Sequence, residues 1–186
     1  MHKHEPQQRS NILVGPAIIW SVLKMQDTAG LYGKVVFAGT FDHLHEGHKH
    51  LLRTASKLGK RVAIGLTSDR MLDSKSKKHL VQSYSQRHGV LEAFLREENI
   101  IDRCSIFPIE TMEGGADKME DLEALIVSDE IEVVENAFVI NDKRIKRGLK
   151  RFHIIVIPRV RTPDGRPLSS SRIRDGEEFE PANLIY

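Results

Sequence analysis

The chain has 186 residues, of which 40% are hydrophobic and 29% charged, and its 28 Lys and Arg against 26 Asp and Glu give a formal net charge of +2. This length and composition predict one α/β domain with terminal extensions, and the near-balanced charge excludes a general attraction to nucleic acid or to a membrane surface. Cys104 is the only cysteine, which excludes an internal disulfide and indicates a reducing, cytoplasmic location.

Residues 1–33 are predicted to form an N-terminal extension, either disordered or a short helix, ahead of a domain at 34–180. The apolar stretch from Ala17 to Leu23 is too short to cross a bilayer, and no clear small-residue cleavage site follows it. We therefore expect neither a transmembrane helix nor a signal peptide. Two interpretations of the extension stay open: translation starts at Met25, or a short amphipathic helix docks on the domain or on a partner.

The most informative segment of the chain is Lys34–His48, KVVFAGTFDHLHEGH. Val35–Ala38 has the pattern of a buried strand, Gly39 permits a tight turn, and His45 and His48 flank the expected start of a helix. Main-chain N–H groups at a helix start, with the positive end of the helix dipole, attract anions. Imidazoles at such a place can donate hydrogen bonds to phosphoryl oxygens as charge builds in a transition state. The segment therefore predicts a phosphate-binding site.

After this motif, strand and helix patterns alternate. This alternation predicts a Rossmann-like, doubly wound parallel sheet of about five strands flanked by helices. The expected elements are a helix at about 48–58, a strand at 61–66, a helix at about 85–98, strands at about 105–109 and 124–128, a helix at about 129–147 and a strand at 152–157. The segment at 110–123 is expected to hold a Gly114-Gly115 loop and a short acidic helix.

Two of these helices are expected to pack on the sheet through apolar faces. The expected buried residues are Val90, Leu91, Phe94 and Leu95 in the first helix and Ile131, Val134, Phe138 and Ile145 in the second.

Ligands of an open parallel sheet bind at the carboxyl ends of its strands. The segments expected at this edge are 39–48, 67–78, 128–130 and 168–174. The last of these, Leu168-Ser-Ser-Ser-Arg-Ile-Arg174, places three serines at a helix start, where hydroxyls cap free N–H groups and can also donate to an anion. It predicts a second phosphate site, with a plain helix cap as the alternative.

Both motifs resemble known signatures. Gly39-Thr-Phe-Asp42 followed by His45-Glu-Gly-His48 is similar to the GTFD…HxGH signature of the nucleotidylyltransferase superfamily, whose members move AMP or CMP from a nucleoside triphosphate onto a phosphorylated acceptor. The serine segment resembles the second signature, usually written ISSTxIR, with Leu168 in place of Ile and Ser171 in place of Thr. Both replacements keep the chemistry.

Four later segments narrow the resemblance to the phosphopantetheine adenylyltransferase of archaeal and eukaryotic type. These segments are 64–69, 127–130, 139–144 and 147–149, and the resemblance covers most of the chain. Two places depart from the family pattern: Ser83-Tyr-Ser-Gln-Arg87 lacks the acidic residue expected beside the tyrosine, and the turn Ser128-Asp-Glu130 differs from the usual form.

This resemblance implies an enzyme that moves AMP from ATP onto 4′-phosphopantetheine, giving dephospho-coenzyme A and pyrophosphate. Mg²⁺ would be carried by the ATP phosphates rather than by protein ligands, and neither nucleic acid nor membrane would be a partner. The sequence leaves open whether the protein is a monomer or a homo-oligomer. The residues implied are His48, His45, Lys75 and Lys77 in catalysis; Gly39, Thr40, Phe41, His45, His48, Ser128, Ser169, Ser170, Ser171 and Arg174 in ATP binding; and Thr40, Asp42, Lys75 and Arg87 in acceptor binding.

Alternative functions share parts of this pattern. A cytidylyltransferase or an FMN adenylyltransferase would use the first motif on another phosphorylated acceptor, and a nucleotide-binding regulator or RNA partner would use it without catalysis. The spacing of His43, His45 and His48 also permits a zinc site, although the glycine at the helix start and the serine segment favour phosphate.

Overall fold

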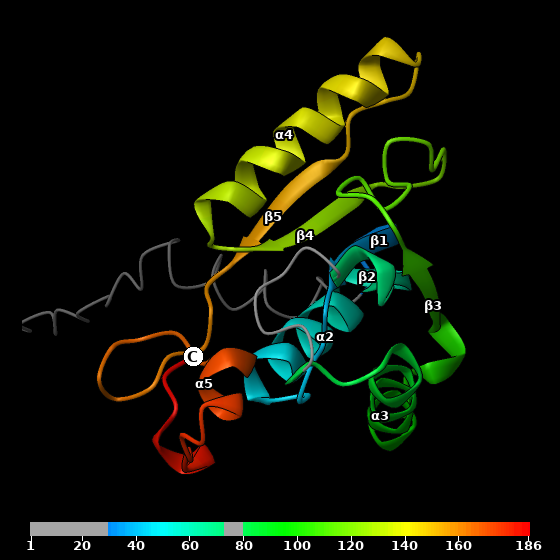
Figure 1. Ribbon diagram of the computed structural model, residues 1–186. Helices are drawn as coiled ribbons and strands as arrows, with labels where there is room; N and C mark the ends of the chain where they lie inside the picture. Colours follow the sequence, from blue (N-terminus) through cyan, green and yellow to red (C-terminus); the bar gives the residue numbers. More distant parts are fainter. Residues whose placement is uncertain (1–29, 73–79) are drawn as a thin grey trace, which may run out of the picture.

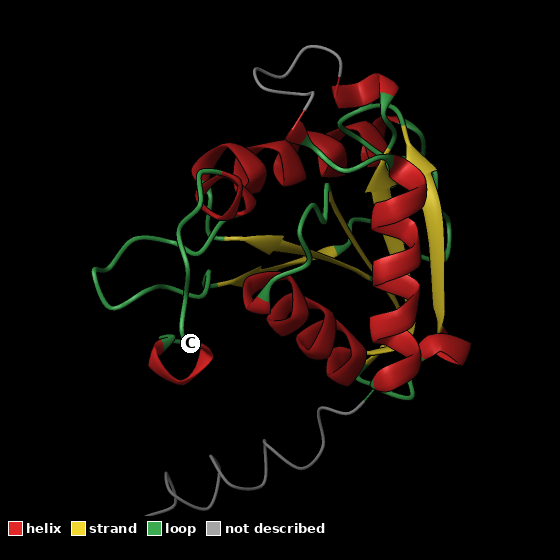
Figure 2. Cartoon of the chain, turned by 60° about the horizontal axis from the view of Figure 1, so that its bottom comes forward, coloured by secondary structure: helices red, strands yellow, loops and turns green. Residues whose placement is uncertain are grey.

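The computed structural model describes residues 30–72 and 80–186 of the chain. Within these residues, five parallel strands form one sheet in the order β3-β2-β1-β4-β5, with helices on both faces (Figures 1 and 2). The predicted Rossmann-like fold is confirmed. The strands are β1 (Tyr32–Gly39), β2 (Gly59–Thr67), β3 (Cys104–Ile109), β4 (Ala124–Ser128) and β5 (His153–Ile157), and the α-helices are α2 (Glu46–Leu58), α3 (Tyr84–Glu97), α4 (Ile131–Lys146) and α5 (Ser170–Arg174).

The sheet separates two apolar clusters. Side chains of α2 and α3, such as Leu52 and Leu91, pack with Phe37 on one face, whereas Ala137 and Ile140 of α4 pack on the other face. Alternate residues of a strand point to opposite faces, which is why neighbouring apolar residues of β1 serve both clusters. The strand order reverses between β1 and β4, so the segments that follow these two strands lie at the position where such folds bind ligands.

The segment between β3 and β4 differs from the prediction. Residues 112–118, which include the expected Gly114-Gly115 loop, form consecutive turns, and the expected short acidic helix is not formed. The reason lies in Gly114 and Gly115, whose φ angles are +53° and +81°. Two successive left-handed residues cannot continue a right-handed helix.

The predicted inner face of α4 is wrong. Ile131, Phe138 and Ile145 are 75%, 59% and 48% exposed, and Val134 is half-buried. The buried side of the helix consists of Ala137, Ile140, Asn141 and Arg144. In α3, the prediction was right for Leu91, Phe94 and Leu95 but wrong for Val90, which is 44% exposed.

Hydrogen bonds to the backbone explain why polar residues of α4 face inward. Asn141 donates to the carbonyl of Phe152 and accepts from its N–H, at 3.0 Å each. Arg144 donates to the carbonyl oxygens of Ala116, Met119 and Lys150 at 2.6–2.9 Å. The period of the helix was predicted correctly, and its rotation about its own axis was not, because these hydrogen bonds to other segments offset much of the cost of burying Asn141 and Arg144.

No helix in the described part of the chain is long and apolar enough to cross a bilayer.

Candidate active site

The turn after β1 places the first motif at the carboxyl edge of the sheet. Phe41 and His43 adopt left-handed backbone conformations, with φ of +52° and +44°, which in non-glycine residues are strained and cluster at functional sites. Phe41 is only 2% exposed, and its ring packs edge-on against Phe37, at 5.7 Å between ring centroids, and at a tilt against His48, at 5.3 Å. Its predicted contact with ATP is therefore replaced by a supporting role beneath the histidine ring.

The two histidines of the motif stack on each other at the start of α2. His45 is the N-cap residue and His48 lies in the first turn; their ring centroids are 3.9 Å apart and the planes are inclined by 21°. Gly47 leaves room for this arrangement, because a Cβ atom there would lie 3.0 Å from the His45 ring. The HxGH spacing thus holds two imidazoles as one rigid pair beside free helix N–H groups.

Burial keeps both imidazoles neutral. Burial lowers the pKa of His45 from 6.5 to about 4, against the opposing charges of Glu46 and Asp42. The pKa of His48 is also lowered well below its ordinary value, by burial and by the neighbouring His45. The Nδ1 atoms of both rings are buried without a hydrogen-bond partner, which leaves Nε2 as the nitrogen that each ring can present to a ligand.

The serine segment lies directly against this motif, as Figure 1 shows for α5 and the start of α2. Ser169 is the N-cap of α5 and accepts from the N–H of Arg172, while the Ser170 hydroxyl donates to the carbonyl of Asp42 at 2.7 Å. Arg174 forms an ion pair with the Asp42 carboxylate and donates from Nη2 to Ser171 Oγ at 3.0 Å. The two predicted phosphate sites are therefore neighbours.

Asp42 links these segments and does not face a ligand. Its side chain is 1% exposed; Oδ1 accepts from the backbone N–H of Gln82 at 2.9 Å, and Oδ2 accepts from Arg174. The acceptor contact predicted for Asp42 does not agree with this arrangement, because both carboxylate oxygens already hold protein donors.

Arg87 is likewise internal. It is 0% exposed and donates to the carbonyls of Thr40, Thr67 and Gln82 at 2.8–2.9 Å and to the Asp69 carboxylate at 2.7 Å. The predicted acceptor contact is again not what the structure shows. The guanidinium instead holds together the ends of β1 and β2 and the start of α3.

The other predicted residues lie as follows. Gly39 ends β1, where a Cβ atom would lie 3.2 Å from the Phe41 ring, and Thr40 is half-buried beside it. Ser128 ends β4 and its hydroxyl lies 3.2 Å from a carboxylate oxygen of Glu130. Lys75 and Lys77 lie outside the described residues.

Comparison with known proteins agrees with the geometry. Residues 36–176 match the cytidylyltransferase-like family. The chain is 42% identical over 143 residues to the phosphopantetheine adenylyltransferase of Methanopyrus kandleri, which covers 77% of this chain and 89% of the relative. It is 43% identical over 145 residues to that of Thermococcus kodakarensis, which covers 78% and 86%. The chain belongs to the phosphopantetheine adenylyltransferase family.

Solved structures show the same fold. A protein of unknown function from Archaeoglobus fulgidus is 34% identical, with a TM-score of 0.59 over 67% of this chain and 88% of that chain. A bifunctional NMN adenylyltransferase/ADP ribose pyrophosphatase from Francisella tularensis is 19% identical, with a TM-score of 0.52 over 78% of this chain and 41% of that chain.

Sequence reasoning missed an ion-pair cluster beside Ser128. Arg159, just after β5, donates to the Asp129 carboxylate at 2.7 Å and lies 3.4 Å from Glu130, and Arg161 lies 3.5 Å from Asp129. Burial raises the pKa of Asp129, but the hydrogen bonds and charge of Arg159 outweigh this and lower it. Both the basic residues and the acidic turn at Ser128-Asp-Glu130 are visible in the sequence, but their pairing is not, because they follow different strands.

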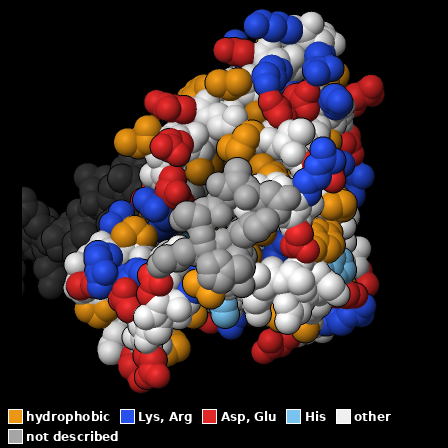
Figure 3. All heavy atoms as spheres, in the orientation of Figure 1, with side chains coloured by type: hydrophobic (Ala, Val, Ile, Leu, Met, Phe, Trp, Pro, Cys, Tyr) orange, Lys and Arg blue, Asp and Glu red, His pale blue; other side chains and the backbone are white. Residues whose placement is uncertain are grey.

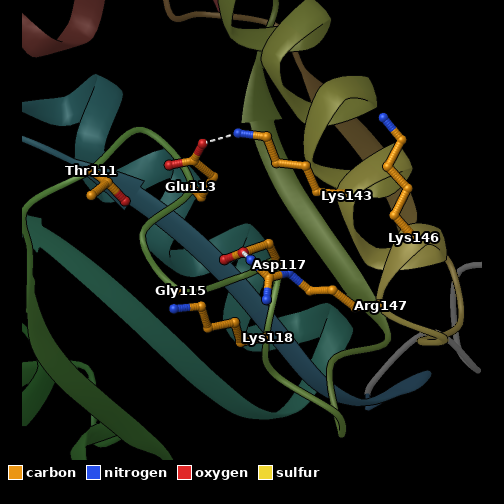
Figure 4. Close-up of a pocket in the computed structure, with 8 residues that line it drawn as sticks. All are labelled: Thr111, Glu113, Gly115, Asp117, Lys118, Lys143, Lys146 and Arg147. Carbon is orange, nitrogen blue, oxygen red and sulfur yellow. Dashed lines mark hydrogen bonds and ion pairs between the residues drawn. The ribbon is translucent and has the colours of Figure 1, made fainter.

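A cavity of about 510 Å³ lies elsewhere, between α4 and the segment after β3 (Figure 4). None of the predicted site residues that the structure describes lines it. Its carboxylates are paired, Glu113 with Lys143 and Asp117 with Arg147 at 3.0 Å. The candidate active site of this family member is therefore the pair of motifs, where buried ring nitrogens lack partners, and not this cavity.

The zinc alternative finds no support in the described residues, among which no group of three or more His, Cys, Asp or Glu is arranged to hold a metal. His45 and His48 lie face to face instead of converging on one point.

Proposed function

We propose that this chain transfers AMP from ATP to the phosphate of 4′-phosphopantetheine, giving dephospho-coenzyme A and pyrophosphate, in the cytoplasm. The relatives named phosphopantetheine adenylyltransferase support this choice of substrates. The structural observation that carries it is the direct contact between the histidine motif and the serine segment through Asp42, Ser170 and Arg174.

The reaction requires little acid or base catalysis from the protein. A phosphate monoester is largely ionised near neutral pH, so one of its oxygens can attack the α-phosphorus of ATP directly. A new P–O bond forms as the bond to the β-phosphate oxygen breaks, and pyrophosphate leaves with the electron pair. Catalysis then depends on aligning two anions and stabilising the charge they share.

The stacked histidines suit this task. We assign Nε2–H of His48 to the α-phosphate and His45 to the neighbouring phosphates. Neutral imidazole rings can bind the phosphates without first giving up the tightly held water of an imidazolium ion. The negative charge of the bound triphosphate would then favour protonation of the rings. The free N–H groups at the start of α2 add to the same attraction.

The serine segment would hold the far end of the triphosphate. Ser169, Ser170, Ser171 and Arg174 are assigned to the β- and γ-phosphates, and Ser171 is the most exposed of the three serines. In the structure Arg174 donates to Asp42 and to Ser171, and its Nε is buried without a partner. Ser128 is assigned to the nucleotide.

The acceptor phosphate needs donors of its own. We assign Thr40 to it, together with Lys75 or Lys77 from the loop between β2 and α3. Positive charge there would offset the repulsion between two phosphate groups.

Mg²⁺ would be held by the β- and γ-phosphate oxygens and by water. Mg²⁺ binds oxygen ligands, keeps several waters and often uses few protein groups, so an ATP-borne ion fits a chain whose described residues offer no metal-binding cluster. It would neutralise charge on the pyrophosphate leaving group.

The test is a substrate panel. The purified protein is incubated with ATP or CTP and with 4′-phosphopantetheine, glycerol phosphate or FMN, and pyrophosphate release is measured while products are identified by mass spectrometry. We expect turnover with ATP and 4′-phosphopantetheine only. A preference for CTP, product only with glycerol phosphate or FMN, or nucleotide binding without any product would reject the proposal in favour of the corresponding alternative.

A further inference from the structure

The serine segment needs contacts beyond Asp42, because α5 is too short to be stable by itself. It has five residues, Ser170–Arg174, and an isolated helix of fewer than about 12 residues is marginal in water. One side of α5 is fixed to the histidine motif through Ser170 and Arg174. With about 3.6 residues per turn, Arg172 lies on the opposite side of the helix. The contacts of Arg172 therefore show how the outer side of α5 is held.

Arg172 is the centre of a hydrogen-bonded cluster. Its Nη1 donates to Thr162 Oγ1 at 2.8 Å and to the Pro167 carbonyl at 3.1 Å. Its Nε and Nη2 donate to Glu177 Oε2 at 2.9 and 2.7 Å. The guanidinium also lies over the Phe179 ring, 4.7 Å from the ring centroid. The side chain is only 13% exposed, so these charge-assisted hydrogen bonds are stronger than bonds made at an open surface.

The four partners of Arg172 come from two segments that flank α5. The first two belong to a hairpin at 160–168, and the other two belong to the C-terminal segment at 177–186. The hairpin and the C-terminal segment are joined by two backbone hydrogen bonds of 2.9 Å between Arg161 and Ile185. In Figure 1 the hairpin (orange) lies on the side of α5 away from α2, and Figure 3 shows basic and acidic side chains next to one another at this place. Arg172 thus ties α5 to both segments.

The donors of Arg172 are fully used inside this cluster. A guanidinium has five N–H groups, and each finds an acceptor once the Asp164 carboxylate, 3.4 Å from Nη2, is included with Thr162, Pro167 and Glu177. No N–H of Arg172 is left for a phosphate. In this respect Arg172 differs from Arg174, whose Nε is without a partner.

We propose that Arg172 is a positioning residue: it holds the serine segment where the hydroxyls meet the β- and γ-phosphates of ATP, and it does not itself bind them. This inference rests on the proposed function, because it takes the serine segment as the place where those phosphates bind. A segment that is held on both sides before ATP arrives does not have to be ordered by the ligand. Loss of Arg172 therefore weakens the grip on the two outer phosphates.

The first test compares ligands with and without these phosphates. In titration calorimetry, Arg172→Gln should bind ATP and pyrophosphate at least about tenfold more weakly than the natural chain. AMP, which lacks the β- and γ-phosphates, should bind both proteins equally. Arg103→Gln is the matched control, because Arg103 also ties two segments together, through the carbonyls of Ser56 and Gly59 at 3.1 Å each, but at the amino edge of the sheet. It should leave all three affinities unchanged.

The second test separates KM from kcat. With saturating 4′-phosphopantetheine, Arg172→Gln should raise the KM for ATP by about tenfold or more and change kcat by less than about threefold, because a contact that is equally strong in the ground and transition states affects KM alone. Arg172→Lys keeps the charge but lacks the planar fork that reaches both flanking segments, so its KM should lie between those of Arg172→Gln and the natural chain. Circular dichroism checks that each variant folds, and Arg172→Lys, the milder change, carries both tests if Arg172→Gln does not.

Three outcomes decide the role of Arg172. Natural affinity for ATP and pyrophosphate in the variants overturns the proposal. An equal fall in affinity for AMP also overturns it, because Arg172 would then serve only general stability. A natural chain that binds ATP but releases no pyrophosphate with 4′-phosphopantetheine rejects the proposed function alone, and a selective loss of ATP and pyrophosphate binding in Arg172→Gln then still supports the positioning role.

Discussion

The Asp42 carboxylate and the Arg174 guanidinium form an ion pair across 132 residues of sequence, and this pair joins the histidine motif to the serine segment. The side chains are 1% and 15% exposed, so the pair is largely removed from water. The backbone of Asp42 also accepts the Ser170 hydroxyl. Two turns that would bind one triphosphate are thus held in register by a single residue.

Asp42→Asn should therefore cost stability as well as activity. Removal of one partner from a buried pair leaves the other charge uncompensated, and we expect the free energy of unfolding in urea to fall by about 2–4 kcal/mol. Asp142→Asn, which breaks an exposed pair with Arg151 at 3.5 Å, should cost less than about 1 kcal/mol. Equal losses in the two variants would contradict the linking role of Asp42.

His48→Ala should lower turnover by on the order of 10²–10³, the usual effect of removing one transition-state donor. ATP affinity, measured by calorimetry, should change much less, because the serine segment still holds the β- and γ-phosphates. Near-normal turnover would remove His48 from the catalytic role.

Gly47→Ala tests the geometry of the histidine pair without removing either ring. The added Cβ atom would lie 3.0 Å from the His45 ring, so the stack must open and we expect turnover to fall by about tenfold or more. Gly89→Ala is the matched control, because a Cβ atom there meets nothing within 4 Å. In the middle of α3 it should raise the free energy of unfolding by about 0.5–1 kcal/mol and leave turnover unchanged.

The histidine pair should also make stability depend on pH. Between pH 6.5 and about 4 the unfolded chain protonates His45 while the folded protein keeps it neutral. Its contribution to the free energy of unfolding is therefore full above pH 6.5 and is lost as the pH falls towards 4.

Urea denaturation across this range should give a shallower pH slope for His45→Gln than for the natural chain. In NMR titrations, ATP should raise the pKa of both rings, since the triphosphate favours the charged form. Parallel slopes would show that folding does not lower the pKa of His45, and a pKa that ATP leaves unchanged would show that the rings do not respond to the phosphates.

A large part of the candidate site could be predicted from the sequence because it depends on interactions between residues close together in the chain. The apolar run of β1, the glycine turn, the HxGH spacing and the capping serine each act within a few residues, and the alternation of strands and helices was enough for the parallel sheet. The boundaries of β4 were predicted as the structure has them.

Errors arose where a side chain's partner lies far away in the chain. Arg87 and Asp42 were expected to contact the acceptor, since an exposed ion and an internal one look alike in a sequence. In α4, Asn141 and Arg144 face inward because carbonyl groups from other segments receive them. Hydrophobicity alone favoured Phe138 for that face.

The sequence by itself determined the fold class, the family and the two motifs proposed to bind phosphate, because helix starts, caps and strand periodicity are short-range properties of the chain. Only the tertiary structure decided that the motifs meet through Asp42 and Arg174, that Arg87 is a buried support, and that α4 presents an apolar flank. These features depend on which backbone and charged groups come together on folding, and burial turns each such contact from a weak surface interaction into a strong one.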